Sequence, residues 1–394
     1  MEDGGNRIQI LVVDDEPDLE LLIRQRFRRK IRDGAYEFSF AANGKEALDF
    51  VDSRARVDVI LSDINMPVMD GLTLLANLQE IEHGNFKTII VSAYGDMGNI
   101  RTAMNRGAFD FVTKPIDFED LEITIEKTIL HVLELRNAEA NRLELDRVNG
   151  ELEVASRIQQ AIIPKEFPAF PEHRQFALYA EMRPALQVSG DFYDYFLLND
   201  HELGIAIADV AGKGVPAALI MSATRALLKA EASRLGNPAD CLGAVNEHLS
   251  AENISSMFVS LFYGVLDFND GIFRYASAGH AMPYILTGNQ VRQVPRSRGT
   301  VLGVDMKSRY EERDIALERG DILFFSTDGI MEAFNREREE YSDDRLEILL
   351  RSVKDRDVRN LVQTVVADVQ RFVGSARQSD DMTAMALSYL GVPF

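Results

Sequence analysis

Four aspartates in the C-terminal half of the chain have surroundings that suit the binding of divalent metal ions. They are Asp191 in SGDFYD, Asp209 in ADVAGKG, Asp328 in STDG and Asp380 in SDDMT, each at the edge of an apolar run and near glycine or another acid. Strand ends can gather carboxylates in one cleft, and glycine permits close backbone approach. Because oxygen-only ligands suit Mg²⁺ or Mn²⁺ rather than zinc, the pattern predicts a metal site that hydrolyses an anionic substrate.

A second set of polar residues follows apolar runs in the N-terminal third. Asp14 and Asp15 come directly after the first run, Asp63 closes the third, Ser92 closes the fourth and Lys114 follows the fifth. In parallel sheets, ligands bind beyond the carboxyl ends of the strands, where strand order switches. We therefore expect these side chains to lie at one edge of a sheet.

The elements that would position this second set alternate between apolar runs and helix-like stretches. The runs are IQILVV (8–13), FSFAA (38–42), VDVIL (57–61), TIIVS (88–92) and FDFV (109–112). Short buried strands that alternate with helices predict an α/β unit with a doubly wound, five-stranded parallel sheet of the flavodoxin-like kind. We place this unit at residues 1–130.

The next segment predicts a long helical connector at residues 131–163. Between Pro115 and Pro164 the chain contains no proline and, after Gly107, only Gly150 as glycine. A seam of residues at three-and-four spacing favours a dimeric coiled coil: Leu145, Val148, Leu152, Ala155, Gln159 and Ile162. A single amphipathic helix packed on one domain is the alternative, because the seam is short and Arg142 and Gly150 weaken it.

From about Phe176 onward the apolar runs become longer and rich in strand-forming residues. They include ELGIAIADV, SMFVSLFYGVLDF, DILFFSTDG and MTAMALSYL, with helices expected at 215–233, 239–250 and 358–373. Runs of neighbouring strands followed by helices predict an α+β sandwich of two antiparallel sheets flanked by helices, at residues 164–394. We also expect Asp343 and Asp344 to cap a helix that begins near Arg345.

Composition excludes several classes of protein. The formal net charge is −20, which disfavours direct DNA binding, because nucleic-acid affinity rests on clustered Lys and Arg. Cys241 is the single cysteine, so no disulfide can form within the chain. With neither a leader-like start nor an apolar run of about eighteen residues, we expect a cytoplasmic protein without membrane contact.

The N-terminal third resembles the receiver domain of bacterial response regulators. Four motifs carry the resemblance: LVVDDEP (11–17), LSDINMPVMDG (61–71), VSAYGD (91–96) and FVTKP (111–115). The resemblance implies that Asp63 is the phosphoacceptor, that Asp14 and Asp15 hold Mg²⁺ with it, and that Lys114 binds the phosphoryl oxygens. These roles are chemically consistent, because a dication and an ammonium offset the negative charge of the carboxylate and the phosphoryl group.

The same resemblance assigns two switch positions in the receiver. Ser92 would supply the switch hydroxyl and Phe111 the switch aromatic, and Phe lacks the hydroxyl contacts that Tyr could make. The isomer of the Lys114-Pro115 bond stays open, since only about 5–6% of such bonds are cis in folded proteins.

The C-terminal half resembles the PPM family of metal-dependent Ser/Thr protein phosphatases, in its bacterial SpoIIE-type (protein phosphatase 2C-like) branch. The motifs are LEVASRIQQAIIP (152–164), VSGDFYD (188–194), ADVAGKGVPAAL (208–219), SAGHAMPYIL (277–286), STDGIMEA (326–333) and SDDMTAM (379–385). The resemblance implies two Mg²⁺ or Mn²⁺ ions held by Asp191, Asp209, Asp328, Asp380 and the Val210 carbonyl.

Other residues near these motifs have weaker assignments. Asp381 and Asp194 rank as supporting groups, and Glu332 is a further outer candidate. We expect a structural role for His280, because no base stands near it in the sequence. Lys213 could attract phosphate or hold its loop, and the residues do not decide between these.

Together the two resemblances predict a two-component response regulator with a phosphatase output. Two ions roughly 3.5–4 Å apart can activate a water for in-line attack on a phosphoryl group. The expected substrate is phosphoserine or phosphothreonine on an anti-sigma-factor antagonist in a partner-switching cascade. The expected partners are a sensor histidine kinase or phosphotransfer protein and a second copy of the chain, bound through the connector.

A non-catalytic adaptor is the alternative function. RssB-type regulators have a similar architecture and bind a sigma factor, and a chain can keep metal ligands yet act by binding. The identity of the substrate and kinase, and whether phosphorylation of Asp63 activates or inhibits, stay open at the level of sequence.

Overall fold

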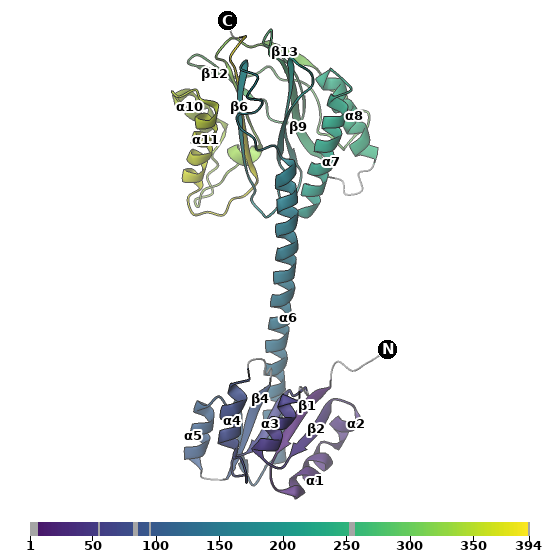
Figure 1. Ribbon diagram of the computed structural model, residues 1–394, viewed down its shortest axis with the longest axis vertical. Coiled ribbons are helices and arrows are strands. Elements are labelled where there is room, and N and C mark those ends of the chain that lie inside the picture. Colours follow the sequence, from purple (N-terminus) through teal and green to yellow (C-terminus); the bar gives the residue numbers. More distant parts are fainter. Residues whose placement is uncertain (1–6, 54–55, 82–85, 94–95, 252–256, 393–394) are drawn as a thin grey trace. The chain divides into compact units, whose positions relative to one another are not determined.

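The computed structural model describes residues 7–53, 56–81, 86–93, 96–251 and 257–392 of the 394-residue chain. Two of the segments quoted above reach beyond these residues, VSAYGD at positions 94–95 and SMFVSLFYGVLDF at position 256. Contacts divide the chain into two compact units, Met1–Val148 and Asn149–Phe394. The division falls within helix α6 (Phe118–Ile162), drawn in Figure 1 as one continuous helix. The domain limits at residues 130 and 163 stay predictions.

The first unit contains a parallel sheet in the order β2-β1-β3-β4-β5, which confirms the predicted fold class. Its strands are β1 (Ile8–Val13), β2 (Tyr36–Ala41), β3 (Val59–Asp63), β4 (Lys87–Ala93) and β5 (Asp110–Lys114). All five residues of β3 are buried, as expected for a strand covered on both faces. Strand β3 begins and ends two residues later than the predicted run at 57–61, and Asp63 is therefore its last residue.

Helices cover both faces of this sheet (Figure 1). They are α1 (Pro17–Arg26), α2 (Arg28–Arg32), α3 (Gly44–Asp52), α4 (Gly71–Gln79), α5 (Met97–Asn105) and the beginning of α6. On one face Ile23 of α1 and Ile125 of α6 pack against Ile10 and Val12 of β1. On the other, Ala47 and Leu74 pack against Leu11 and Val13. The alternation of β1 residues between the two cores follows from the two-residue period of a strand.

The predicted seam on α6 is only partly available to another helix. Leu145 and Val148 have exposed fractions of 60% and 37%. Gln159, in contrast, is buried, and its side-chain amide exchanges two hydrogen bonds with the backbone of Ser189. Ile162 packs against the core of the second unit. The last turn of the seam therefore belongs to that unit, which corrects its assignment to a dimer contact.

The second unit contains two antiparallel sheets, in the orders β13-β10-β9-β8-β7 and β12-β11-β14-β15-β6. The first comprises β7 (Phe192–Leu197), β8 (Glu202–Val210), β9 (Val259–Asp267), β10 (Ile272–Ala278) and β13 (Arg313–Ala316). The second comprises β6 (Phe176–Arg183), β11 (Tyr284–Thr287), β12 (Gln290–Gln293), β14 (Ile322–Ser326) and β15 (Met382–Tyr389).

Helices flank the two sheets as separate layers (Figure 1). They are α7 (Val215–Ala232) and α8 (Pro238–Ala251) on the first sheet, and α10 (Asp343–Ser352) and α11 (Val358–Val373) on the second, with the short α9 (Asp328–Met331) after β14. One core lies between the sheets and one beneath each helix pair. This arrangement confirms the predicted α+β sandwich.

The start of α10 differs from the prediction. Ser342 occupies the N-cap position, and Asp343 and Asp344 lie in the first helical turn. There the two carboxylates face the positive end of the helix dipole instead of capping it.

Among the residues that the structure describes, no helix has both the length and the apolar character needed to cross a membrane.

Candidate functional site

The receiver aspartates meet at the carboxyl edge of the parallel sheet. Ligand oxygens of Asp14, Asp15 and Asp63 lie within 4.8 Å of one another, and they form the only such group of acidic, histidine or cysteine residues within the described ranges. Burial raises the pKa of Asp14, although the backbone N–H of Glu16 and the ammonium of Lys114 oppose that shift. Three clustered carboxylates suit a hard cation such as Mg²⁺.

Lys114 ends β5 and points its ammonium group into this cluster. Its Nζ donates to Asp63 Oδ2 at 2.7 Å, to Asp14 Oδ2 at 3.1 Å and to Glu16 Oε1 at 3.2 Å. Burial works against the charge of Lys114, but hydrogen bonds to Asp63 and Asp14 outweigh it and raise the lysine pKa. The lysine therefore stays charged beside the predicted phosphoacceptor.

Ser92 lies on β4 with its hydroxyl buried, and among the described residues its Oγ has no hydrogen-bond partner. An unpaired buried hydroxyl is costly unless a further group satisfies it, which is compatible with the predicted role of Ser92 as the switch hydroxyl. Phe111 packs partly buried against a small core that includes Ile90 and Ala103. The Lys114-Pro115 bond, left open by the sequence, is cis.

The four phosphatase aspartates come from the ends of strands in both sheets. Asp191 immediately precedes β7, and Asp209 is the penultimate residue of β8. Asp328 begins α9 directly after β14, and Asp380 lies in the loop before β15. Burial and the charges of neighbouring aspartates raise the pKa values of Asp191, Asp209 and Asp328, and Asp380 is one of those neighbouring charges, so the predicted set lies in one region.

Asp191 is the most buried of these carboxyl groups, with an exposed fraction of 1%. Its Oδ2 accepts hydrogen bonds from Thr327 Oγ1 and Thr383 Oγ1, both at 2.7 Å. Burial, and then the charge of Asp209, raises the pKa of Asp191 well above its usual value. Each threonine belongs to a motif that carries an aspartate, Thr327 to STDGIMEA and Thr383 to SDDMTAM, but no pattern in the sequence marks either one as a partner of Asp191.

Replacing Thr383 with valine is expected to weaken metal binding in the phosphatase unit. The change keeps the side-chain shape but removes one of the two hydroxyls that orient Asp191, and loss of such a supporting contact costs about 10–100-fold in metal affinity. The readout is the Mn²⁺ concentration that gives half-maximal phosphatase activity. Thr224→Val serves as the control, because that buried hydroxyl bonds only to the backbone of Ile220. Equal Mn²⁺ requirements for both variants would contradict the role of Thr383.

Mutual repulsion links the other carboxylates. Burial, followed by the charge of Asp328, raises the pKa of Asp209 to about 7, even though Asp209 shares a hydrogen bond with Asp191. Burial and the charge of Asp380 raise the pKa of Asp328. The repulsion marks a place where a bound cation would be stabilised, and the all-oxygen donors fit Mg²⁺ or Mn²⁺.

The phosphatase carboxylates are less tightly gathered than the receiver group, because within the described ranges only the receiver aspartates meet the 4.8 Å limit. Two ions separated by roughly 3.5–4 Å would spread their ligands over a wider space than one ion does. The looser arrangement is therefore compatible with a pair of ions.

Lys213 supplies a positive charge at the edge of this cluster. Its Nζ lies 2.9 Å from Asp380 Oδ2 and also donates to the carbonyl of Ser379. The lysine thus joins the loop after β8 to the loop before β15. The sequence left open whether Lys213 attracts phosphate or holds its loop. This contact favours the second role, because Lys213 holds the loop that carries Asp380.

Two glycines permit close packing beneath the aspartates. A Cβ on Gly329 would lie only 1.8 Å from the carbonyl oxygen of Asp381. A Cβ on Gly190 would lie 3.0 Å from the carbonyl oxygen of Val210, the predicted backbone ligand. Asp381 itself accepts from the backbone N–H groups of Ala185 and Gly190, at 2.7 and 2.8 Å, so its contacts are with the backbone around the site.

The side chains of Asp194 and His280 contact residues other than the four aspartates, although Ser260, the partner of His280, lies opposite Asp209 in the pairing of β8 with β9. Asp194 lies 3.0 Å from the guanidinium of Arg225 on α7, and both side chains are largely buried. His280 is buried, its Nδ1 is 2.9 Å from Ser260 Oγ, and burial lowers its pKa to about 4. A neutral, packed histidine accords with the structural role expected for it. Glu332 lies at the surface. Partial burial of its carboxyl group, and then the charge of Asp328, raise its pKa.

Metal binding to the phosphatase unit is expected to depend on pH. A pKa of about 7 means that Asp209 holds a proton through most of the range below neutrality in the metal-free protein. A cation must displace that proton, so it stabilises the fold more at high pH, and this gain is lost as pH falls through 7. Thermal unfolding with and without MnCl₂ should show a larger Mn²⁺-induced rise in Tm at pH 8 than at pH 6. An equal rise at both values, or the same pH dependence in Asp209→Asn, would contradict the assignment.

Comparisons with known proteins divide the chain in the same way. Residues 10–126 match the family described as response regulator receiver domain, and residues 199–390 match the family described as stage II sporulation protein E (SpoIIE). Asp209, Asp328 and Asp380 fall within the second match, whereas Asp191 precedes it. The receiver aspartates and Lys114 fall within the first.

Individual relatives show the same pattern. The chain is 30% identical to phosphoserine phosphatase RsbU of Bacillus subtilis over 217 residues, which are 55% of this chain and 63% of that protein. It is 33% identical to sporulation initiation phosphotransferase F of B. subtilis over 119 residues, 30% of this chain and 91% of that protein. The chain spans about half the length of the first two curated relatives that it matches, 42% and 63%.

One solved structure supports the fold of the second unit. The SiaA-PP2C domain of Pseudomonas aeruginosa superposes with a TM-score of 0.56 and 23% identity, covering 62% of this chain and 98% of that one. At this identity the likeness concerns the fold alone.

Proposed function

We propose that the output of this chain is metal-dependent dephosphorylation of phosphoserine or phosphothreonine in a protein. The chain belongs to the response regulators through its receiver domain, and it carries a SpoIIE-type phosphatase domain. The family matches show a response regulator with a protein phosphatase domain. The metal requirement and the residue specificity are part of the proposal.

The observation that carries the proposal is the position of four aspartates at strand ends of the two sheets, where burial and neighbouring carboxylates raise the pKa values of Asp191, Asp209 and Asp328. Bound Mg²⁺ or Mn²⁺ would supply a water of lowered pKa and positive charge for the phosphate group. The chain's own residues orient the ligands. Thr327 fixes Asp191 from one side of the cluster, and Lys213 fixes Asp380 from the other.

The proposed signal is phosphorylation of Asp63. The contact between Lys114 and Asp63 and the unpaired hydroxyl of Ser92 support it, because both groups can bind phosphoryl oxygens without rebuilding the site. A sensor histidine kinase or a phosphotransfer protein would deliver the phosphoryl group, with Mg²⁺ held by the receiver aspartates. A homodimer formed through the exposed part of α6 is proposed as the unit that responds.

The proposed substrate is a phosphorylated anti-sigma-factor antagonist. RsbU is named a phosphoserine phosphatase, and that name supports phosphoserine as the substrate class here. The test is release of phosphate from a phosphoserine protein of this kind by the whole chain, with MnCl₂ and with excess EDTA. We expect release only with the metal. Sigma-factor capture without any phosphate release would favour the adaptor instead.

A further inference from the structure

A pocket of about 340 Å³ lies beside the aspartate cluster of the phosphatase unit. Its lining comes from α9, the end of α11 and the loop that leads into β15: Gly329, Ala333, Gln370, Val373, Gly374, Ala376, Gln378, Ser379 and Met382. The volume falls within the range of ligand pockets, roughly 300–1,000 Å³. None of the roles assigned above uses this space.

Two residues that line the pocket, Gly329 and Ser379, are chain neighbours of the candidate metal ligands Asp328 and Asp380. Gly329 follows Asp328 in the chain, and a Cβ built on it would lie 3.4 Å from Cβ of Asp380. Ser379 precedes Asp380, and its carbonyl accepts from Lys213. A phosphate held at the aspartates would therefore sit within a residue or two of the pocket, since an extended chain advances about 3.3 Å per residue.

Four of the nine lining residues have apolar side chains and two are glycines, and the three polar ones are hydrogen-bonded or exposed. Ala333, Val373 and Met382 are buried, and they pack in the core beneath α10 and α11. The Gln378 amide donates to the carbonyls of Arg183 and Asp380, at 2.8 and 2.6 Å. Gln370 is exposed on α11. A site that offers little free hydrogen bonding selects an apolar guest.

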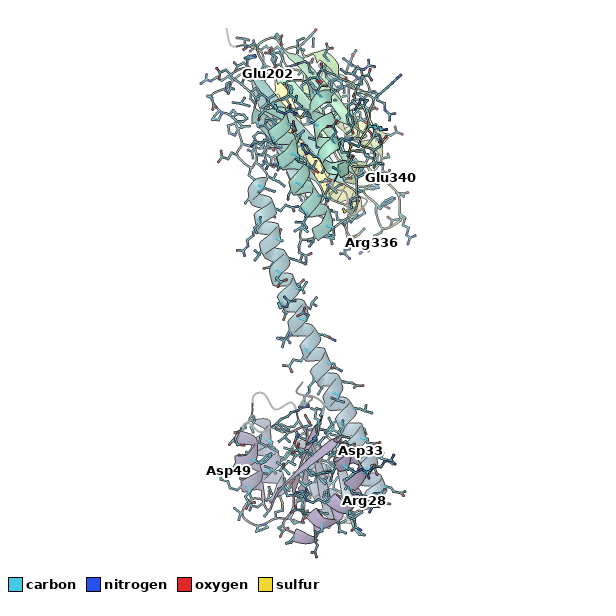
Figure 2. All side chains as sticks on the ribbon, turned by 90° about the vertical axis from the view of Figure 1, so that its right-hand side faces the viewer. Arg28, Asp33, Asp49, Glu202, Arg336 and Glu340 are labelled. Carbon is cyan, nitrogen blue, oxygen red and sulfur yellow. The ribbon has the colours of Figure 1, made fainter. Side chains whose placement is uncertain are left out.

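The segment after α9 borders the pocket and folds back on itself. Tyr341 N donates to the carbonyl of Ala333, and Phe334 pairs with Glu340 in an isolated bridge. Phe334 keeps an exposed fraction of 42%. Figure 2 shows Arg336 and Glu340 on this segment, at the surface of the phosphatase unit. Phe334 therefore adds one exposed aromatic side chain to the segment that follows the pocket residue Ala333.

We propose that this pocket binds an apolar side chain of the substrate protein, one to three residues from its phosphorylated serine or threonine. The inference rests on the proposed function and adds a specificity determinant to it. The charges of substrate and site would match. The phosphate would lie near Lys213 and the carboxylate-bound cations, and the neutral side chain would lie near Ala333 and Met382. Pockets that receive side chains near a reacting group are a common basis of peptide selectivity.

The test compares two tryptophan variants on the same helix. Gln370→Trp places a bulky group where the pocket opens, at a position already exposed. Gln363→Trp is the matched control, because Gln363 is also exposed on α11 but does not line the pocket. The probes are para-nitrophenyl phosphate and phosphoserine peptides in which one leucine is moved through the three positions on either side of the phosphoserine. The enzyme is the whole chain with MnCl₂.

We expect the wild type to prefer one leucine position over a leucine-free peptide by about tenfold in kcat/KM. Gln370→Trp should lose this preference, and Gln363→Trp should keep it. All three proteins should hydrolyse para-nitrophenyl phosphate at rates within about twofold of one another, because that probe reaches the metals without filling the pocket. A second variant, Ala376→Leu, fills the pocket from another wall and should behave like Gln370→Trp.

Several results would overturn the pocket while leaving the metal chemistry intact. One is that leucine has no effect on kcat/KM at any position. Another is that the wild type hydrolyses para-nitrophenyl phosphate but no peptide. A third is that Gln370→Trp keeps the preference for a leucine position. A fall in hydrolysis of both probes by Gln370→Trp would also overturn it. Failure of the proposed function looks different, since the wild type would then hydrolyse neither probe, and the pocket proposal would fall with it.

Discussion

Replacing Asp209 with asparagine is expected to lower Mn²⁺-dependent phosphate release from a phosphoserine protein by about a thousandfold. Asp209 is the carboxylate on which the charges of Asp328, Asp380 and Asp381 all act, so its loss removes the centre of the negative field that a cation would neutralise. Asp328→Asn should have a comparable effect. The measurement is initial phosphate release at saturating MnCl₂.

Two controls separate loss of chemistry from loss of fold. Asp314→Asn removes the same formal charge from the exposed strand β13 and should leave turnover unchanged. In the absence of metal, Asp209→Asn should unfold at the same temperature as the wild type or higher, because it relieves repulsion among buried carboxylates. Unchanged turnover in the Asp209→Asn, Asp328→Asn double variant would reject metal-centred hydrolysis.

Replacing Asp63 with asparagine is expected to abolish phosphorylation of the receiver by acetyl phosphate. Lys114 holds its ammonium 2.7 Å from Asp63 Oδ2, which orients that carboxylate and offsets charge on an incoming phosphoryl group. Intact-mass measurement after incubation with acetyl phosphate and MgCl₂ should detect a phosphorylated wild type and no phosphorylated variant. Asp52→Asn, at the exposed end of α3, is the matched control and should be phosphorylated like the wild type.

The same variant tests whether the receiver controls the phosphatase. In the wild type, acetyl phosphate should change phosphatase turnover by a factor of about five or more, a typical size for coupling between sites. Asp63→Asn should show no change. Equal turnover with and without acetyl phosphate in both proteins would contradict receiver control, and would leave the metal chemistry as it stands.

The receiver could be predicted from sequence almost completely, and strand ends explain why. Each of Asp14, Asp63 and Lys114 stands at the carboxyl end of a strand, so a parallel sheet brings them to one edge once the strands are recognised. The sequence shows where a strand ends but not the isomer of a following proline. The structure added that the Lys114-Pro115 bond is cis and that Ser92 Oγ is buried without a partner among the described residues.

The phosphatase unit was less predictable at the level of contacts. Its fold and the gathering of its aspartates followed from the motifs. In contrast, Thr383 bonds to Asp191 across 192 positions of sequence. Such pairings depend on how two sheets face each other, and no local pattern encodes that geometry. The partners of Asp194 and Asp381 were missed for the same reason.

Two predictions were wrong because a local sequence pattern does not encode tertiary contacts: the dimer contact of Gln159 and the helix cap at Asp343 and Asp344. Gln159 fits the spacing of a helical seam, but its amide satisfies the buried backbone of Ser189 instead. Asp343 and Asp344 resemble the cap of a helix that begins near Arg345, yet α10 begins at Asp343 and Ser342 occupies its N-cap position. For Gln159, hydrogen bonds to a distant backbone segment replace the helix contact that the spacing predicts.

The position of bound manganese tests the proposed chemistry most directly. Crystals of the chain soaked in MnCl₂ would be measured for anomalous scattering at the manganese edge. We expect two neighbouring peaks in the phosphatase unit, both in contact with carboxylate oxygens of Asp209, with Asp328 and Asp380 completing the ligands. A map with manganese at the receiver aspartates and none near Asp209 would contradict a metal-dependent phosphatase.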